Sequence, residues 1–222
     1  MPRVSTLLPH LTITMQNTPD FILFAQHGWA DTEAAIAAMA QTLATPQTLV
    51  ITPNLGWWKT WWRIKPLIKQ VDGIATETIA QYPQTPIRII GYSLGGLIWV
   101  ELLNQHPEWW SQVESFVLVA SPIGGVDLAR NFTFLGMGVG IAGAMLDNRR
   151  QMAESIAKVI PTLVIAGDIG GGTDGAVTLE ETKVPGANFF YLPTLSHPTL
   201  KNHPAVAEVI HDFWQNPVII DG

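Results

Sequence analysis

The stretch Ile87-Arg-Ile-Ile-Gly-Tyr-Ser-Leu-Gly-Gly-Leu-Ile-Trp-Val100 contains the features that decide the fold. Its first four residues are mostly β-branched and apolar, which predicts a buried strand. Gly91-Tyr-Ser93-Leu-Gly95 follows directly and leads into an apolar run typical of a helix. So tight a turn forces the serine into a strained conformation and leaves room only for glycine two residues to either side. We therefore expect the Ser93 hydroxyl at the end of a strand, in front of a helix N-terminus whose N–H groups can stabilise an anion.

Several other apolar segments repeat the strand pattern. They occupy residues 21–25, 48–52, 114–120, 162–166 and 188–192, and residues 11–15 alternate as a short strand would. Between them, apolar side chains recur at helical spacing after Asp31, which we expect to cap a helix, over residues 67–79, and over 206–213. Continuous apolar strands that alternate with amphipathic helices predict an α/β fold. We expect a mostly parallel sheet of about six or seven strands with helices on both faces, and reactive side chains at the carboxyl ends of the strands.

Composition describes a single compact domain over residues 1–222. The chain is 47% hydrophobic and only 14% charged, which excludes a disordered protein. A net charge of −6 argues against nucleic-acid binding, and the absence of cysteine excludes disulfides and a thiol nucleophile. The first residues lack the apolar core of a signal peptide, so we expect a cytoplasmic protein without a transmembrane helix.

One region, at about residues 122–160, breaks the alternation of strands and helices. The apolar segment 132–146 within it holds four glycines and is too short to span a bilayer. We read it as a lid-like insertion over the site, or else as a crossover helix with an irregular start.

A serine hydroxyl needs a neighbouring base to act as a nucleophile. Among the six histidines, His197 and His203 follow the last predicted strand, and loops after strands present their side chains to the site. We expect His197 to be the base, since His203 opens the following helix. His27 follows the first buried strand, but in a turn with Gly28 that suits another role.

The acid that orients the base has two candidates in the loop after the preceding strand. Asp168 follows that strand directly and can simply cap the glycine turn, whereas Asp174 lies further along, where the loop can reach back across the site. We prefer Asp174. The resulting order, Ser93, Asp174, His197, is one of the three known chain orders for a serine triad.

Five motifs together resemble the α/β-hydrolases, in particular the small bacterial lipases and esterases. They are His27-Gly-Trp29, Gly91-Tyr-Ser-Leu-Gly-Gly96, Ala120-Ser-Pro-Ile-Gly-Gly125, Thr173-Asp-Gly-Ala-Val177 and Ser196-His-Pro198, in the family's order. The resemblance implies that Ser93 attacks an acyl carbon while the backbone N–H groups of Trp29 and Leu94 form the oxyanion hole. It also implies that Asp174 holds His197. The loop from Gly167 to Thr173 is longer and richer in glycine than the family needs, so Asp168 stays open as the acid.

The tryptophan-rich segment Trp57–Lys65 is not among the motifs of this resemblance. It holds four of the nine tryptophans together with three basic residues. Tryptophan mixed with lysine and arginine is typical of a membrane-interface contact, although large aromatic side chains also fill cores and line pockets. Membrane contact, pocket lining and core packing therefore all remain open for this segment.

The expected activity is hydrolysis of a carboxylic ester of a lipid or another apolar acyl group. A thioesterase or acyltransferase uses the same triad, and a non-catalytic binding protein on the same scaffold is a third reading. We expect His27, Gly28, Tyr92, Trp57 and Trp58 to contact the substrate. Two aspartates in a glycine loop are weak grounds for calcium, so we expect neither a metal nor a cofactor.

Overall fold

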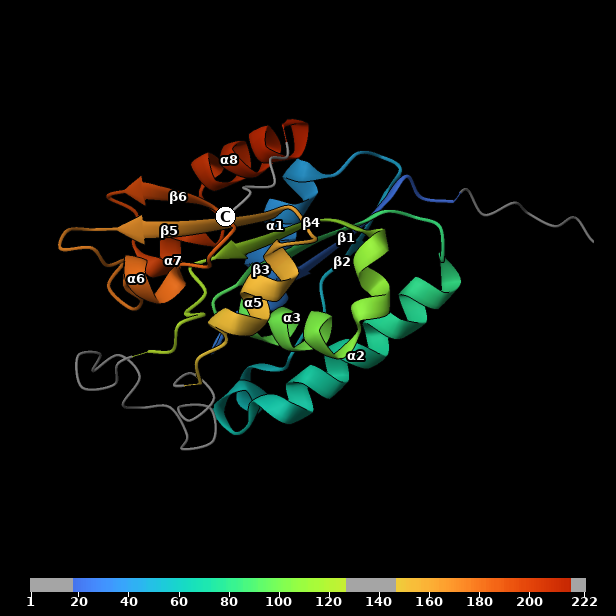
Figure 1. Cartoon of the computed structure of the whole chain (residues 1–222), viewed down its shortest axis with the longest axis horizontal. Helices are drawn as coiled ribbons and strands as arrows, with labels where there is room; N and C mark the ends of the chain where they lie inside the picture. Colours follow the sequence, from blue (N-terminus) through green and yellow to red (C-terminus); the bar gives the residue numbers. More distant parts are fainter. Residues whose placement is uncertain (1–17, 127–146, 217–222) are drawn as a thin grey trace, which may run out of the picture.

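A computed structural model describes residues 18–126 and 147–216. A parallel sheet of six strands lies at its centre, in the order β2-β1-β3-β4-β5-β6 (Figure 1). The strands are β1 (Phe21–Gln26), β2 (Thr48–Ile51), β3 (Ile87–Tyr92), β4 (Val113–Val119), β5 (Thr162–Asp168) and β6 (Asn188–Pro193). All six predicted apolar segments within the described residues are strands, and the α/β class is confirmed.

Helices cover both faces of the sheet, as Figure 1 shows. One face packs against α2 (Ile64–Gln81), α3 (Leu94–Gln105) and α5 (Arg150–Ala157), and the other against α1 (Glu33–Leu43) and α8 (Pro204–Gln215). The shorter elements are the 3₁₀ turns η1 (Trp57–Trp61) and η2 (Pro107–Gln112), with helices α6 (Leu179–Thr182) and α7 (His197–Leu200). Within the described parts of the chain, no helix is long and apolar enough to cross a membrane.

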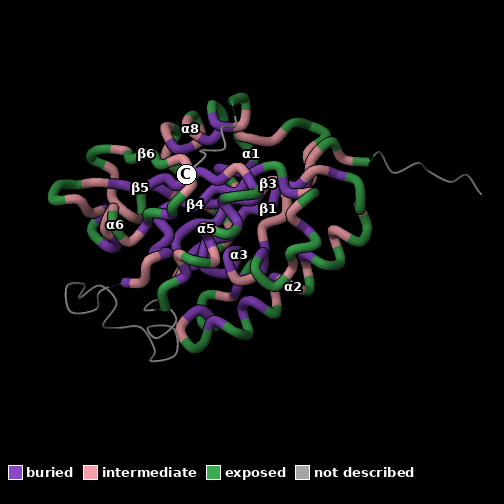
Figure 2. The backbone as a smooth tube through the Cα atoms, viewed as in Figure 1, coloured by how far each residue is buried: buried purple, intermediate pink, exposed green. Residues whose placement is uncertain are grey.

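The two cores follow from the alternation of side chains along each strand. Ile22 and Phe24 of β1 pack with α2 and α3, whereas Leu23 and Ala25 of the same strand pack with α1 and α8. A strand covered on both faces is apolar along most of its length, which is why these segments read as nearly continuous apolar runs. Figure 2 shows the central strands buried and the outer surfaces of the helices exposed.

We expected Asp31 to cap a helix, but it does not. Helix α1 begins at Glu33, and its N-cap residue is Thr32, which makes no side-chain capping bond. The Asp31 carboxylate instead accepts from the Thr32 N–H and forms an ion pair with Lys201 at 2.9 Å. Asp31 therefore pairs with Lys201, a residue far along the sequence, and does not cap α1. The expected strand at 11–15 and the glycine-rich segment 132–146 lie outside the described residues.

Candidate active site

Ser93 lies in the turn between β3 and α3. Its backbone has φ 52° and ψ −120°, a conformation that L-residues rarely adopt and that stores strain. The Ser93 N–H donates to the Val119 carbonyl of β4 at 2.8 Å, which ties the turn to the neighbouring strand. A Cβ on Gly95 would collide with the carbonyl oxygen of Gln26. Glycine at this position therefore allows the helix to begin directly against the end of β1.

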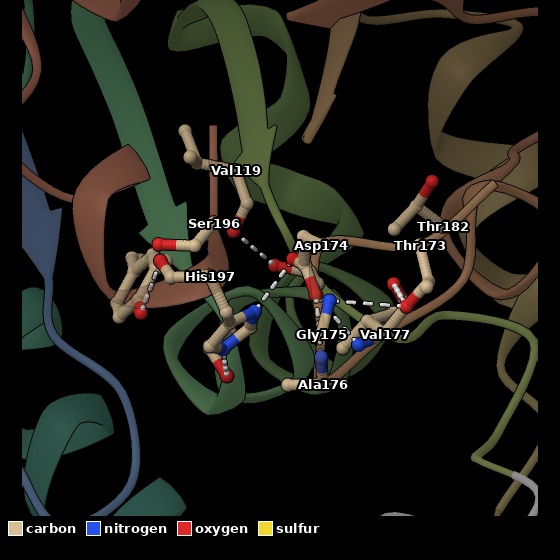
Figure 3. A network of polar contacts seen from close by, with 12 residues as sticks. Val119, Thr173, Asp174, Gly175, Ala176, Val177, Thr182, Ser196 and His197 are labelled. Atoms are coloured by element: carbon tan, nitrogen blue, oxygen red, sulfur yellow. Dashed lines mark hydrogen bonds and ion pairs between the residues drawn. The ribbon is translucent and has the colours of Figure 1, made fainter. Parts of the chain in front are cut away.

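A chain of hydrogen bonds links Ser93, His197 and Asp174. The Ser93 Oγ lies 3.1 Å from His197 Nε2, and His197 Nδ1 lies 2.7 Å from Asp174 Oδ2. The carboxylate only accepts, so Nδ1 carries the imidazole proton and Nε2 is left to accept from the serine hydroxyl. Figure 3 shows the His197–Asp174 part of this network. The sequence thus predicted three residues that the structure brings together from three separate segments after strands.

Asp174 is held in place by the backbone of its own loop. Its Oδ1 accepts from the N–H groups of Ala176 and Val177 at 2.9 and 2.7 Å, and its carbonyl accepts from the His197 N–H at 2.8 Å (Figure 3). The side chain is 1% exposed. Both carboxylate oxygens are therefore used, one to fix the loop and one to hold the imidazole.

The alternative acid and base lie elsewhere. Asp168 Oδ1 accepts from the N–H groups of Gly170 and Gly172 at 2.8 and 3.1 Å, so this carboxylate organises the glycine turn. His203 precedes α8, and its Nδ1 accepts from the Ala205 N–H at 3.2 Å as a helix cap. Neither side chain reaches His197 or Ser93, which favours Asp174 and His197 over their competitors.

The backbone N–H groups of Leu94 and Trp29 are the two that the resemblance assigned to an oxyanion hole. Leu94 is the first residue of α3, where no intrahelical acceptor exists for its N–H. Trp29 lies in the loop after β1 and lines the same cavity as Ser93. Neither N–H has a hydrogen-bond partner within residues 18–126 and 147–216. Both groups predicted from the sequence are therefore free to donate.

This chain is similar to known proteins in its three-dimensional structure. No protein-family model and no curated protein matches the sequence. Among solved structures, a mature lipase from Bacillus licheniformis has a TM-score of 0.67 at 16% identity over 89% of this chain and 93% of that one. A bromoperoxidase from Bacillus anthracis gives 0.67 at 15% identity over 90% and 93%. A thermophilic esterase from Thermogutta terrifontis gives 0.63 at 14% identity over 89% and 90%. This chain has the α/β-hydrolase fold.

In this α/β-hydrolase fold, His27 is a structural residue of the loop that carries Trp29. The side chain is fully buried, its Nδ1 lies 2.9 Å from the Gly28 carbonyl, and its Nε2 accepts from the Leu55 N–H at 3.0 Å. Burial lowers the pKa of His27, so the ring stays neutral. A fully buried ring cannot touch a substrate, and the expected substrate contact of His27 is replaced by an anchoring role between the loops after β1 and β2.

A cavity of about 240 Å³ opens beside Ser93. Its wall includes Trp29, Tyr92, Ala176, His197, Pro198 and Lys201. Tyr92 donates its hydroxyl to the His197 carbonyl at 3.0 Å, and burial raises the pKa of Tyr92 so that it remains a donor. A Cβ on Gly28 would meet the Ser93 Cβ at 3.0 Å, so this glycine keeps the approach to the serine open.

The remaining expected substrate contacts, Trp57 and Trp58, are not part of this cavity wall. Trp57 instead donates its Nε1–H to the Ala30 carbonyl at 2.9 Å, and Trp58 is 75% exposed. The Asp31–Lys201 pair at the cavity was missed at the sequence level, where only the position of Lys201 four residues after His197 hinted at it. A larger groove of about 520 Å³ between α1 and α8 contains none of the three linked residues, so we place the site at the smaller cavity.

Metal ligands are not gathered here. Within the described residues, no group of three or more His, Asp or Glu side chains is arranged to hold a metal ion. The cavity places Ser93 beside His197, with the Asp174 carboxylate hydrogen-bonded to the far side of the imidazole.

Proposed function

We propose that this protein is a serine hydrolase that cleaves carboxylic esters of lipid-like or other apolar acyl groups. The observation that carries the proposal is the hydrogen-bonded chain from Ser93 Oγ through both nitrogens of His197 to Asp174. A strained serine, a base that accepts from it and a buried carboxylate behind the base form the arrangement that activates a hydroxyl at neutral pH.

In the first half of the reaction, Ser93 Oγ attacks the acyl carbon while its proton passes to His197 Nε2. The carbonyl oxygen becomes an oxyanion, which accepts from the N–H groups of Leu94 and Trp29. Asp174 stabilises the imidazolium through the 2.7 Å bond. The tetrahedral intermediate then collapses, the C–O bond breaks, and the departing alkoxide takes the proton from Nε2 to leave as the alcohol.

In the second half, water replaces the alcohol. His197 removes a proton from the water, the hydroxide attacks the acyl carbon, and collapse releases the acid and returns the proton to Ser93. The cavity wall supports an apolar acyl group, since Trp29, Ala176 and Pro198 offer apolar surface beside the serine. The structural neighbours, a lipase and an esterase among them, agree with ester substrates.

The experiment that tests this function combines probe labelling with a substrate panel. We expect a fluorophosphonate to label the parent protein and the control Ser155→Ala, an exposed serine on α5, but not Ser93→Ala. p-Nitrophenyl esters of rising chain length and a matched acyl thioester then measure kcat/KM. Labelling that persists in Ser93→Ala would overturn the proposal, and a clear preference for the thioester would establish the thioesterase alternative.

A further inference from the structure

The geometry points to a lipid-surface docking site formed by the tryptophan patch, which we define as Trp57, Trp58, Trp61 and Trp62 with the basic residues Lys59 and Arg63 between them. The occupant we assign is an anionic lipid surface. The inference rests on the proposed function, because it identifies where the ester enters, and it extends that function with an interaction surface.

Exposure of the patch is the first observation. Trp58 and Trp62 are 75% and 73% exposed, and Trp57 is 38% exposed. A surface patch of large aromatic side chains with basic residues between them fits a membrane interaction site. An indole combines a large apolar body with one N–H donor, which suits the boundary between lipid headgroups and acyl chains.

The patch is rigid. Trp57 donates to the Ala30 carbonyl and packs edge-on against Trp58, with ring centroids 4.6 Å apart. Trp61 packs against Trp29, also at 4.6 Å. A surface that is already ordered loses little conformational entropy when it docks, so more of the apolar contact appears as affinity.

The basic residues of the patch indicate which kind of lipid surface it binds. The sequence has no Asp or Glu between Glu33 and Asp72, while Lys59, Arg63, Lys65 and Lys69 all fall within that interval and are exposed. Lys65 and Lys69 line a groove with the acidic residues Asp72, Glu101 and Asp147, so Lys59 and Arg63 dominate the local positive field. Although the chain has a net charge of −6, Lys59 and Arg63 make this face suited to an anionic surface. Tryptophan mixed with lysine and arginine is typical of a membrane-interface segment, which favours a lipid surface as the occupant.

The patch is continuous with the cavity beside Ser93. Trp29 forms part of the cavity wall and contacts Trp61, and Ala30 lies in the same wall. Turn η1 holds Ala30 on both sides, since the Thr60 hydroxyl accepts from the Ala30 N–H at 3.1 Å and the Trp57 Nε1–H donates to the Ala30 carbonyl. A lipid surface in contact with the patch therefore lies beside the cavity mouth, and an ester reaches the serine along apolar surface.

Vesicle sedimentation tests the proposal with the full chain carrying Ser93→Ala, which prevents lipid turnover. We expect binding to vesicles of phosphatidylcholine with phosphatidylglycerol, and weaker binding to phosphatidylcholine alone. Replacing Trp58 or Trp62 with Ala weakens binding about tenfold each. Lys59→Gln and Arg63→Gln weaken it roughly fivefold each, only with anionic vesicles and less at high salt.

The matched control replaces exposed aromatic residues outside the patch. Phe190→Ala and Tyr191→Ala on β6 remove side chains that are 45% and 52% exposed, and we expect them to leave vesicle binding unchanged. With an otherwise native active site, Trp58→Ala and Trp62→Ala keep the hydrolysis of a soluble short-chain ester. This separates the docking proposal from the proposed function.

The possible results distinguish the docking proposal from the proposed hydrolase function. If the parent hydrolyses soluble esters but binds neither type of vesicle, the docking proposal is overturned while the function stands. A dimer in light scattering that Trp58→Ala dissociates, without vesicle binding, also overturns it and assigns the patch to a second copy. Vesicle binding that needs the patch, in a protein whose Ser93 is never labelled, supports docking and removes the hydrolase function.

Discussion

Asp174→Asn is the substitution whose consequence follows most directly from the structure. The asparagine keeps a carbonyl oxygen that can accept from the Ala176 and Val177 N–H groups, so its amide NH₂ faces His197 where Asp174 Oδ2 now lies at 2.7 Å. An NH₂ group donates, and His197 Nδ1 must then accept. The imidazole proton moves to Nε2, which can no longer accept from the Ser93 hydroxyl at 3.1 Å.

We expect kcat to fall about 10⁴-fold, which corresponds to roughly 5.5 kcal/mol of lost transition-state stabilisation. Loss of the charge on a carboxylate that accepts two backbone bonds costs about 1–2 kcal/mol of folding stability. The variant therefore remains folded but inactive, which urea unfolding and hydrolysis of a p-nitrophenyl ester measure on the same sample.

Asp168→Asn is the matched control, because an asparagine oxygen still accepts from Gly170 and Gly172. We expect its kcat within about threefold of the parent, since this side chain makes no contact with His197. The reasoning fails if Asp168→Asn is the more damaging change, or if Asp174→Asn keeps more than about a tenth of the parent kcat.

Three other predictions test the supports of the site. Because Ser93 has φ 52°, Ser93→Gly relieves backbone strain that Ser93→Ala retains. We expect urea unfolding to give the glycine variant a free energy of unfolding about 1 kcal/mol higher than that of the alanine variant. Equal stabilities would show that the turn is unstrained. Thr60→Val removes the acceptor of the Ala30 N–H in the loop that carries Trp29. We expect kcat to fall about tenfold with little change in KM, and Thr60→Ser to restore kcat. A change in KM alone would refute this positioning role. Since the pKa of His27 is lowered, the unfolded state binds more protons below pH 6.5, and the free energy of unfolding falls with acidification by up to about 1.4 kcal/mol per pH unit. His27→Gln lacks this component, so the stability difference from the parent narrows between about pH 7.5 and pH 5; parallel curves would exclude a neutral His27.

The sheet could be predicted because its strands are covered on both faces. Within the predicted segment 162–166, residues 163–166 are apolar at every position, and the structure extends that strand only to Asp168. The serine turn was also predictable, since Gly91 and Gly95 leave a local signature of the close backbone contacts around Ser93. Local sequence therefore carries the strands and the turn.

Contacts between distant segments could not be predicted in this way. The ring of His27 is anchored to Leu55, and Asp31 pairs with Lys201, 170 residues away. No local pattern distinguishes a buried neutral histidine from one that faces a substrate, because both follow a strand and precede a glycine. The exposure of Trp58 and Trp62 is a similar case, since the same residues would suit a core or a pocket wall.

Strain at the site edge is the clearest example of information that only the fold contains. The described residues with positive φ that are not glycine are Ala30, Ser93, Ala120 and Thr194, and each lies in a loop after a strand. Every one donates its N–H to a distant acceptor: to the Thr60 hydroxyl and to the carbonyls of Val119, Ile165 and Asp168, respectively. Such conformations cost about 1–3 kcal/mol each and persist only where surrounding contacts enforce them. An alanine in this conformation has no sequence signature, yet its hydrogen bond fixes the loop that carries the neighbouring reactive group. The precision of this site therefore depends on backbone bonds between loops that meet only when the sheet has formed.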